Sequence, residues 1–311
     1  MILTVTPNPM LDKTLWVTAF TPGNIHRALR LEILAGGKGI NVARALHLLG
    51  EEVIATGFAG GRTGEAIREV LDKERIPHEF VTIGSTTREG FTIVDSKTWQ
   101  HTSVFEPGHQ LTMEDVEALI EKVQALLPRC RALALCGSMP CAGFDDLFVR
   151  LIAFARQRSV PVMLDTYGEP LRLGLAASPD FLKPNRDEAL QTFGIDSRRP
   201  GGYRAVLEKF AESGATHIFL TDGERPAAVY AAGEFYLAHP PVVRAVNPLG
   251  SGDAVVAAFL YGYLRKFAKP RLIAFTLAAG AVNARQFVPG FANLQQIEEL
   301  ATTIRLEHLR E

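Results

Sequence analysis

The feature that most constrains this chain is its alternation of short apolar runs with longer amphipathic stretches. Runs with the length of buried strands lie at 2–6, 53–58, 132–135, 160–164, 181–183 and 217–220. Stretches with apolar residues at helical spacing lie at 39–49, 63–74, 113–127, 145–157, 186–192, 203–213, 252–266 and 271–286. This alternation predicts an α/β fold, with a mostly parallel sheet covered by helices on both faces.

A second group of strand-like runs interrupts the alternation, because no helical stretch separates its members. These runs lie at 14–17, 28–34, 80–83, 90–94 and 102–105. We expect them to form a small antiparallel sheet, a lid inserted from about residues 14–34 and 80–105. No linker divides the chain, so residues 1–311 are predicted to form a single domain. Because an exposed sheet needs a cover, the lid is expected to close over a cleft and to join two subunits in a homodimer.

Composition argues against several classes of function. The chain has 311 residues, of which 47% are hydrophobic and 22% charged, as in an ordinary globular enzyme. Its net charge of −1 gives no general attraction to nucleic acid or to membrane surfaces. No window approaches the roughly 18 apolar residues that span a bilayer, and the N-terminus does not resemble a signal peptide. Cys130, Cys136 and Cys141 lack the spacing of a zinc site. A cytoplasmic protein with reduced thiols is expected.

Polar residues follow the predicted strands where each strand ends. They are Asn8, Asp12, Gly137, Ser138, Asp165, Asn185, Glu188, Thr221, Asp222 and Gly223. In open α/β sheets, ligands bind at the carboxyl ends of the strands. The sequence therefore predicts a site along one edge of the sheet.

The string G250-S-G-D253 stands at the start of a long apolar helical stretch. Gly250, Ser251 and Gly252 allow backbone N–H groups to approach a ligand, and the helix start adds free N–H groups, which together favour an anion. Asp253 would repel that anion, so its place suggests proton transfer. The alternative is an ordinary loop with an acidic residue in the first turn of a helix.

The string A35-G-G-K-G-I-N-V-A-R-A-L46 is also unusual. Gly36 and Gly37 allow close backbone approach, while Lys38 stands at a helix start, where the helix dipole disfavours a cation. An anionic ligand would offset this conflict, and Asn41 could hydrogen-bond a hydroxyl group. The alternative is a flexible loop with a solvated lysine.

Two further patterns are typical of proteins that bind or transfer phosphate groups. Asn185 and Glu188 share one face of a helix start, which suits Mg²⁺ binding through water, although a capped helix explains the same string. Arg88, in the predicted lid, could hold a phosphate with two hydrogen bonds, although a surface arginine is the simpler explanation. Together with the two glycine-rich strings, these patterns supply what phosphoryl transfer requires. A Walker-A motif and a complete dinucleotide-binding motif are both absent from the sequence.

Along nearly its whole length, the sequence resembles the PfkB (ribokinase-like) carbohydrate kinase family. The resemblance rests on G36-G-K-G-I-N-V-A-R-A-L46 and G250-S-G-D253, with K183-P-N-R-D-E188 as the family's N-x-x-E element. It implies a three-layer ribokinase-like fold with a small β-sheet lid. T4-V-T-P-N-P-M-L-D-K-T14 and the lysine of G-G-K-G are similar to the branch that contains 1-phosphofructokinase and tagatose-6-phosphate kinase. That branch implies a sugar that already carries a phosphate.

The resemblance also implies a role for each matching residue. Asp253 would be the catalytic base, and Gly250, Ser251 and Gly252 would form the anion hole with the Asp253 N–H. The sugar would contact Asp12, Gly37 and Asn41, with Ser138 nearby, and its phosphate would contact Lys38 and Arg88. Asn185 and Glu188 would organise Mg²⁺ through water, and Asn185 would also border the bound ATP. Thr221 and Gly223 would line the nucleotide site, and Asn283 would border the adenine pocket.

Some positions depart from the family pattern. Ser251 replaces an alanine, Pro248 replaces a threonine, and T87-R-E-G-F-T-I93 lacks the Asn and Lys that usually follow T-R.

The expected function is an ATP- and Mg²⁺-dependent kinase that converts fructose 1-phosphate, fructose 6-phosphate or tagatose 6-phosphate to a bisphosphate by in-line transfer. One alternative is a kinase of an unphosphorylated sugar or nucleoside. The other is a regulator that binds a sugar phosphate without catalysis.

Overall fold

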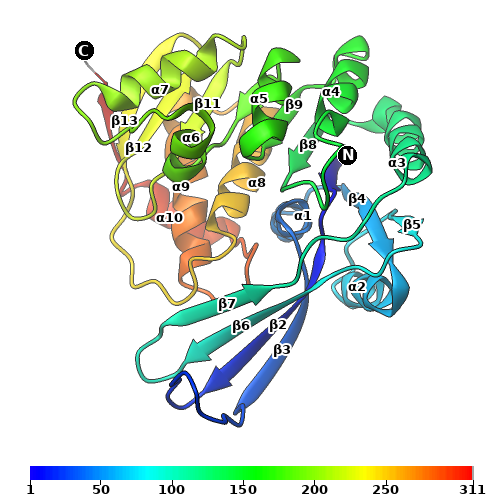
Figure 1. Cartoon of the computed structure of the whole chain (residues 1–311). Coiled ribbons are helices and arrows are strands. Elements are labelled where there is room, and N and C mark those ends of the chain that lie inside the picture. The colour runs from blue at the N-terminus through cyan, green and yellow to red at the C-terminus, as the bar shows by residue number, and fades with distance from the viewer. Residues whose placement is uncertain (310–311) are drawn as a thin grey trace.

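A large twisted sheet runs through the protein, which a computed structural model describes over residues 1–309 (Figure 1). Within those residues the sheet has ten strands in the order β14-β13-β12-β11-β10-β9-β8-β1-β4-β5. The strands from β11 to β5 are parallel, and β12, β13 and β14 extend one edge in antiparallel pairing. The predicted α/β fold with a mostly parallel sheet is confirmed.

The strands and helices predicted for the body are present with similar bounds, and five further elements were not predicted. The strands of the large sheet are β1 (Ile2–Thr6), β4 (Val53–Gly60), β5 (Val81–Ile83), β8 (Ala132–Cys136), β9 (Val162–Asp165), β10 (Phe181–Leu182), β11 (His217–Leu220), β12 (Ala227–Ala231), β13 (Glu234–His239) and β14 (Arg305–His308). The helices are α1 (Lys38–Leu48), α2 (Gly61–Lys73), α3 (Met113–Leu126), α4 (Leu147–Gln157), α5 (Gly168–Ala176), α6 (Arg186–Phe193), α7 (Gly202–Ala211), α8 (Ser251–Leu264), α9 (Lys269–Ala284) and α10 (Leu294–Ala301). Among the described residues, no helix has both the length and the apolar character needed to cross a membrane.

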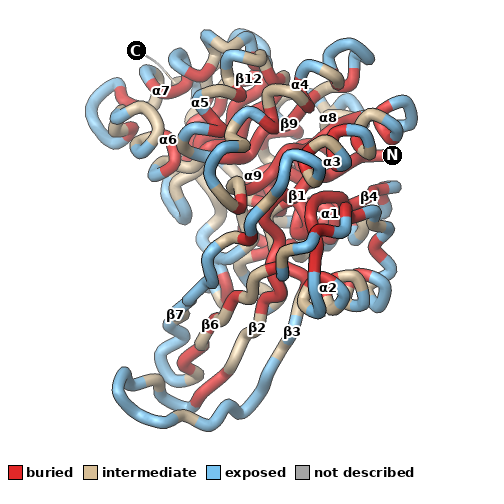
Figure 2. Tube along the Cα trace, turned by 45° about the vertical axis from the view of Figure 1, so that its right-hand side comes forward, coloured by how far each residue is buried: buried red, intermediate tan, exposed pale blue. Residues whose placement is uncertain are grey.

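The sheet separates two apolar cores, one on each face, and the buried backbone in Figure 2 follows this layered arrangement. In β1, Ile2 packs into the core formed with α1, α8 and α9, whereas Leu3 and Val5 pack into the core formed with α3 and α4. Because both faces are covered, the central strands are apolar throughout rather than alternating. Apart from buried threonines such as Thr4 of β1 and Thr56 of β4, polar residues gather at the ends of these strands.

Four strands form the lid, in the order β3-β2-β6-β7, and the lid projects from the body in Figure 1. They are β2 (Met10–Val17), β3 (Arg30–Gly36), β6 (Glu89–Asp95) and β7 (His101–Phe105). The predicted antiparallel pairing is wrong for β2 and β6, which run parallel. Both strands leave the body in the same direction, and each returns through its own hairpin, so the two outgoing strands lie side by side.

The run at 80–83 was also assigned wrongly to the lid. It forms β5, which pairs in parallel with β4 at the edge of the large sheet. Val81 and Ile83 are buried in the core formed with α3, which holds this short strand against the body. The sequence shows only that no helix follows the run, and it does not show which sheet the run joins.

An aromatic contact joins the lid to the body. The rings of Trp16 and Trp99, both from the lid, lie 6.2 Å and 6.0 Å from the ring of Phe287, which follows α9. Nearby, His101 Nε2 of β7 lies 2.9 Å from the carbonyl oxygen of Val246, in the segment that precedes α8. The lid therefore contacts the same segments of the body that carry the G250-S-G-D253 turn.

Candidate active site

The turn before α8 adopts a conformation that only glycine tolerates. Gly250 is the N-cap of α8 and has a φ of 78°, and a Cβ at this position would lie 2.7 Å from the backbone nitrogen of Gly290. The N–H of Ser251 donates to the carbonyl of Pro248 at 3.2 Å. Gly252 and Asp253 therefore supply the N–H groups of the first turn that lack an acceptor within the helix, and these groups favour an anion.

Asn283 lies beneath this turn. Its Nδ2 donates to the Leu249 carbonyl at 2.9 Å and to Ser251 Oγ at 3.1 Å, and its Oδ1 accepts from the N–H of Phe291 at 2.9 Å. The side chain is fully buried. The amide of Asn283 thus forms internal hydrogen bonds that hold the turn, and its place beside the adenine pocket stays a prediction.

Asp253 is buried at the start of α8, and its Oδ2 accepts a hydrogen bond from Asn41 Nδ2 at 2.8 Å. Burial, followed by the negative charge of Asp165, raises the pKa of Asp253 to about 6, although Lys38 acts to lower it. A carboxylate with this pKa is ionised at neutral pH and more basic than an exposed one. It is therefore suited to accept a proton from a hydroxyl group.

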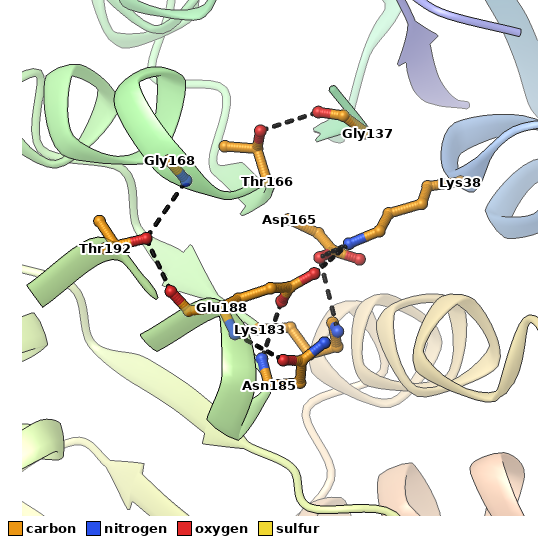
Figure 3. Close-up of polar contacts among 9 residues, drawn as sticks. All are labelled: Lys38, Gly137, Asp165, Thr166, Gly168, Lys183, Asn185, Glu188 and Thr192. Carbon is orange, nitrogen blue, oxygen red and sulfur yellow. Dashed lines mark hydrogen bonds and ion pairs between the residues drawn. The ribbon is translucent and has the colours of Figure 1, made fainter. Parts of the chain in front are cut away.

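Two lysines and two carboxylates meet at the edge of the sheet, as Figure 3 shows. Three of them, Asp165, Lys38 and Lys183, also act on the charge of Asp253. Lys38 Nζ lies 2.9 Å from Asp165 Oδ1 and 2.7 Å from Glu188 Oε1, and Lys183 Nζ lies 3.4 Å from Asp165 Oδ1. The four side chains come from the start of α1, the end of β9, the segment after β10 and the first turn of α6. Residues that are far apart in the chain thus meet at the carboxyl ends of the parallel strands, where open α/β sheets bind ligands.

These carboxylates resolve the conflict at Lys38, the first residue of α1. Burial alone would lower the pKa of Lys38, but Asp165 and Glu188 together raise it well above its usual value. The lysine is therefore charged, despite its place at the positive end of a helix. The sequence suggested that an anionic ligand would offset this charge, and in the structure two acidic side chains of the protein already do so.

Lys183 was not predicted as a site residue from the sequence, and Asp165 was predicted only to follow a strand. A Cβ at Gly252 would lie 2.9 Å from Lys183 Nζ, so the ammonium group stands beside the free N–H groups of α8. Lys183 is only 3% exposed and directly follows a buried strand. A lysine directly after a buried strand could have indicated a site residue, because lysine is rarely buried without an anionic partner.

Asn185 and Glu188 form a capping box at the start of α6. Asn185 Oδ1 accepts from the N–H of Glu188, and Glu188 Oε2 accepts from the N–H of Asn185, both at 2.8 Å. Burial acts to raise the pKa of Glu188, but Lys183 and Lys38 hold it below its usual value. Among the described residues, no group of three or more His, Cys, Asp or Glu side chains could hold a metal directly. A Mg²⁺ ion fits here only through water and the phosphates of a substrate.

Residues predicted to hold the sugar gather between the lid and α1. Gly37 precedes α1 with a φ of 122°, and a Cβ there would lie 2.7 Å from Thr6 Cγ2. Asp12 of β2 stands against Gly36, since a Cβ at Gly36 would lie 3.1 Å from Asp12 Cβ. Burial raises the pKa of Asp12 to about 6, and within residues 1–309 its Oδ1 has no hydrogen-bond partner. A sugar hydroxyl could donate to this oxygen.

Arg88 and Ser138 meet at Asn8, on the side of the site where the lid begins. Arg88 Nη2 donates to the Asn8 carbonyl at 3.2 Å, and Asn8 Nδ2 donates to Ser138 Oγ at 3.2 Å. Within the described part of the chain, Arg88 has no carboxylate within 4.0 Å, and its buried Nε has no partner. Burial lowers the pKa of this guanidinium. A half-buried arginine without an acidic partner is well prepared for an anion.

Thr221 and Gly223 lie where β11 ends, next to the start of α6. Thr221 forms a parallel bridge with Asn185, and its carbonyl accepts from the N–H of Arg186 at 2.9 Å. Gly223 has a φ of 62°, and a Cβ at this position would meet nothing within 4 Å. These residues therefore lie beside the capping box and apart from the contacts of Arg88 and Asp12.

Comparisons with known proteins agree with this fold and arrangement. The sequence profile described as pfkB family carbohydrate kinase matches residues 8–294. A Thermotoga maritima structure described as a possible 1-phosphofructokinase is 26% identical, with all of both chains covered and a TM-score of 0.92. Phosphofructokinase-2 from Escherichia coli, in complex with potassium, is 24% identical, with 97% of this chain and 98% of that chain covered and a TM-score of 0.89. The same enzyme in complex with fructose-6-phosphate has a TM-score of 0.87, at the same identity and coverage.

The family match and the fold define an ATP-dependent carbohydrate kinase. The chain belongs to the pfkB family, whose profile covers most of its length.

Proposed function

We propose that this kinase phosphorylates a ketohexose that already carries a phosphate, namely fructose 1-phosphate, fructose 6-phosphate or tagatose 6-phosphate, to give a bisphosphate. The observation that carries the proposal is Arg88, a half-buried guanidinium without an acidic partner, beside Ser138 and Asn8. Such a group favours a substrate anion in addition to the phosphates of ATP. The relatives described as phosphofructokinases are consistent with this substrate class.

The transfer is direct and in line. Asp12, Gly37 and Asn41 hold the sugar hydroxyls, and Asp253 accepts the proton of the attacking hydroxyl. The sugar oxygen forms a bond to the γ-phosphorus while the bond between that phosphorus and the bridging oxygen breaks, and ADP leaves. Gly250 and Ser251 form the turn that exposes the N–H groups of Gly252 and Asp253. These N–H groups stabilise the negative charge of the transferring phosphoryl group.

The positive charge of the site supports the same proposal. Lys183 stands beside the start of α8, and Lys38 joins it through Asp165. Arg88 would hold the phosphate already on the sugar, while Lys38 would act nearer the transferred phosphoryl group than the sequence suggested. Thr221 and Gly223 would border the nucleotide, beside Asn185.

Asn185 and Glu188 would hold Mg²⁺ through water molecules. Their oxygen atoms are the ligands that Mg²⁺ accepts, and the capping box fixes their orientation. The bound ion would neutralise charge on the phosphate oxygens. The protein would need only these contacts, because Mg²⁺ usually keeps several waters and binds substrate phosphates.

The substrate class is tested by ADP release with Mg-ATP and a panel of fructose 1-phosphate, fructose 6-phosphate, tagatose 6-phosphate, fructose, ribose and adenosine. We expect turnover only with phosphorylated ketoses. Arg88→Met should raise the KM for the sugar about 10- to 100-fold, because a charged hydrogen-bond partner is lost, and leave the KM for ATP unchanged. Arg68→Met, which changes an arginine bonded to backbone carbonyls of the body, is the matched control. Turnover confined to unphosphorylated compounds would contradict the proposal.

We also propose that a second copy of the chain covers the outer face of the lid. Residues alternate between the faces of a strand, and Asp12 lies on the face toward the site. The strand register places the opposite face in rows that are mostly apolar. These residues are Leu15, Leu31, Ile33, Phe91, Ile93 and Val104. Leu31 is 53% exposed and Val104 is 64% exposed, so the face is accessible to a partner.

Sedimentation equilibrium tests this dimer. The unchanged protein should behave as a dimer at micromolar concentration, and Leu31→Glu should shift it to a monomer because a buried charge would be unpaired in the interface. Met113→Glu, which changes an exposed methionine at the start of α3, should leave the dimer intact. A monomer at every concentration of the unchanged protein would refute the proposal.

A further inference from the structure

Arg44 is a buried arginine on α1, and it was not among the residues that the sequence analysis assigned to the site. Its side chain is only 5% exposed. Nη1 donates to Asn41 Oδ1 at 2.8 Å, and Nη2 donates to the Ala35 carbonyl at 2.7 Å. Nε donates to Glu74 Oε2 at 3.0 Å, and Nη1 also lies 3.4 Å from the Pro289 carbonyl. The guanidinium is thus hydrogen-bonded from several sides.

These partners belong to the two halves of the site. Ala35 directly precedes Gly36 and Gly37, which lie next to the predicted sugar position. Pro289 packs against the other half, because a Cβ at Gly250 would lie 2.8 Å from Pro289 Cβ. Arg44 therefore stands between the segment that would hold the sugar and the turn that would hold the phosphoryl group.

The hydrogen bonds also determine which end of the Asn41 amide faces Asp253. An asparagine amide has an oxygen that accepts and a nitrogen that donates, whereas a guanidinium can only donate. Because Arg44 donates to Oδ1, the amide nitrogen must point the other way, toward Asp253 Oδ2 at 2.8 Å. If the amide rotated by half a turn, its oxygen would face the carboxylate, and the two acceptors would repel each other.

We propose that Arg44 is a positioning residue for the catalytic base, acting through Asn41 by fixing the orientation of its amide toward Asp253. The inference rests on the proposed role of Asp253 as the base. Because its side chain is only 5% exposed, Arg44 is expected to touch neither the sugar nor the nucleotide. Its function is to keep a donor directed at the ionised carboxylate, which favours the form of Asp253 that accepts a proton.

Other charged and titratable groups also act on Asp253, and they must be separated from Arg44. Asp165 raises its pKa, whereas Lys38 and Lys183 lower it. Burial, followed by the negative charges of Asp165 and Asp253, raises the pKa of the Cys136 thiol well above its usual value. None of these groups bonds to Arg44, so substitutions of Arg44 leave them in place. The charge of Arg44 also lowers the pKa of Asp12, which burial raises to about 6, so the titration of Asp253 itself must be followed beside the kcat profile.

The experiment is the pH dependence of kcat for Arg44→Met, which keeps much of the side-chain volume but removes every donor. The acid limb of the profile should move upward by about half to one pH unit, because the ionised form of Asp253 loses a fixed donor. At a pH near this limb kcat should fall about threefold to tenfold, and part of the loss should be recovered at higher pH. Arg44→Lys, which still only donates, should show a smaller shift and serves if Arg44→Met does not fold.

Two further variants separate positioning from stability. Glu74→Gln removes the carboxylate partner of Arg44 but keeps the bond to Asn41, so it should lower the Tm without moving the acid limb. Asn41→Ala should move the acid limb by itself, and adding Arg44→Met to it should cause no additional shift if Arg44 acts through Asn41. A full additional shift would overturn the inference, as would an unchanged acid limb in both Arg44 variants.

A readout without turnover separates this inference from the proposed function. The carboxyl resonance of Asp253, assigned through the Asp253→Asn variant, can be titrated by ¹³C NMR in the unchanged protein and in Arg44→Met. An upward shift of its titration in Arg44→Met supports the positioning role even if no sugar in the panel is phosphorylated, and an unchanged titration refutes it. The absence of turnover in the unchanged protein would contradict the proposed function only.

Discussion

We expect Asp253→Asn to lower kcat by about 10²- to 10⁴-fold, the range over which a positioned base contributes to proton transfer. Asparagine is nearly the same size and can still fill the space at the start of α8, but it cannot accept the proton. The KM for ATP should stay within about twofold, because the substitution leaves the backbone N–H groups of the first turn of α8 in place. ADP release at saturating substrate measures the effect.

The same variant should be more stable than the unchanged protein above about pH 6. In the folded protein the pKa of Asp253 is raised from 3.8 to about 6, so folding favours the protonated form. The carboxyl group therefore contributes stability below about pH 4, and this contribution is lost as the pH rises through 6. Asparagine stays neutral, so at pH 8 its advantage in the free energy of unfolding should reach about 3 kcal/mol.

Urea unfolding at pH 4 and pH 8 measures this advantage, which should nearly vanish at the lower pH. Ser251→Ala is a suitable control, because it changes the same turn without changing its charge. Near-normal turnover in Asp253→Asn would contradict the assignment of Asp253 as the catalytic base. A stability difference that does not depend on pH would show that the carboxyl group is not perturbed as the structure indicates.

Lys38→Met should have the second largest effect, and it should reduce stability as well as activity. The substitution removes an ammonium group 2.9 Å from Asp165 and 2.7 Å from Glu188, and the side chain of Asp165 is fully buried. Removing one partner of a buried ion pair leaves an uncompensated charge, so the free energy of unfolding should fall by about 3 kcal/mol. Because positive charge near the transferring phosphoryl group is also lost, kcat should fall about 10²- to 10³-fold.

The two roles considered for Lys38 lead to different kinetic results. If Lys38 acts at the transferring phosphoryl group, Lys38→Met lowers kcat with a variety of phosphorylated sugars. If it binds the phosphate already on the sugar, the variant raises the KM for the sugar and leaves kcat largely unchanged. Lys122→Met, which removes a lysine 3.5 Å from the exposed Glu79, is the control and should change stability by less than about 0.5 kcal/mol.

The sequence was sufficient to predict six parallel strands of the large sheet, because these strands are short, apolar and bounded by polar residues. They are β1, β4, β8, β9, β10 and β11. The run at 217–220 forms β11 with the same first and last residue. Elements without this contrast were missed: α5, α10, β12, β13 and β14. The nine residues of α5 include Gly168 and Pro170 in its first turn, and β12 is mostly alanine, so neither shows clear periodicity.

The site was predictable in outline because carboxyl ends of parallel strands meet at one edge of a sheet. That rule predicted a shared location for Asp165, Asn185 and Thr221 but not their contacts. The pairing of Lys38 with Glu188 joins residues separated by 150 positions, and no local pattern encodes it. Arg44 was not predicted for a related reason. An arginine on an amphipathic helix is usually exposed, and only the packing of α1 shows that Arg44 is buried.

The aromatic contact between the lid and the body gives the protein an optical reporter of its own. The chain has only two tryptophans, and both lie in the lid next to Phe287. Indole emission depends on how far the ring is exposed to water, and Trp16 is buried whereas Trp99 is 39% exposed. Any movement of the lid away from Phe287 would change the surroundings of both rings, with no third tryptophan to add background. If the lid moves when substrates bind and products leave, the unlabelled protein would report that movement in real time.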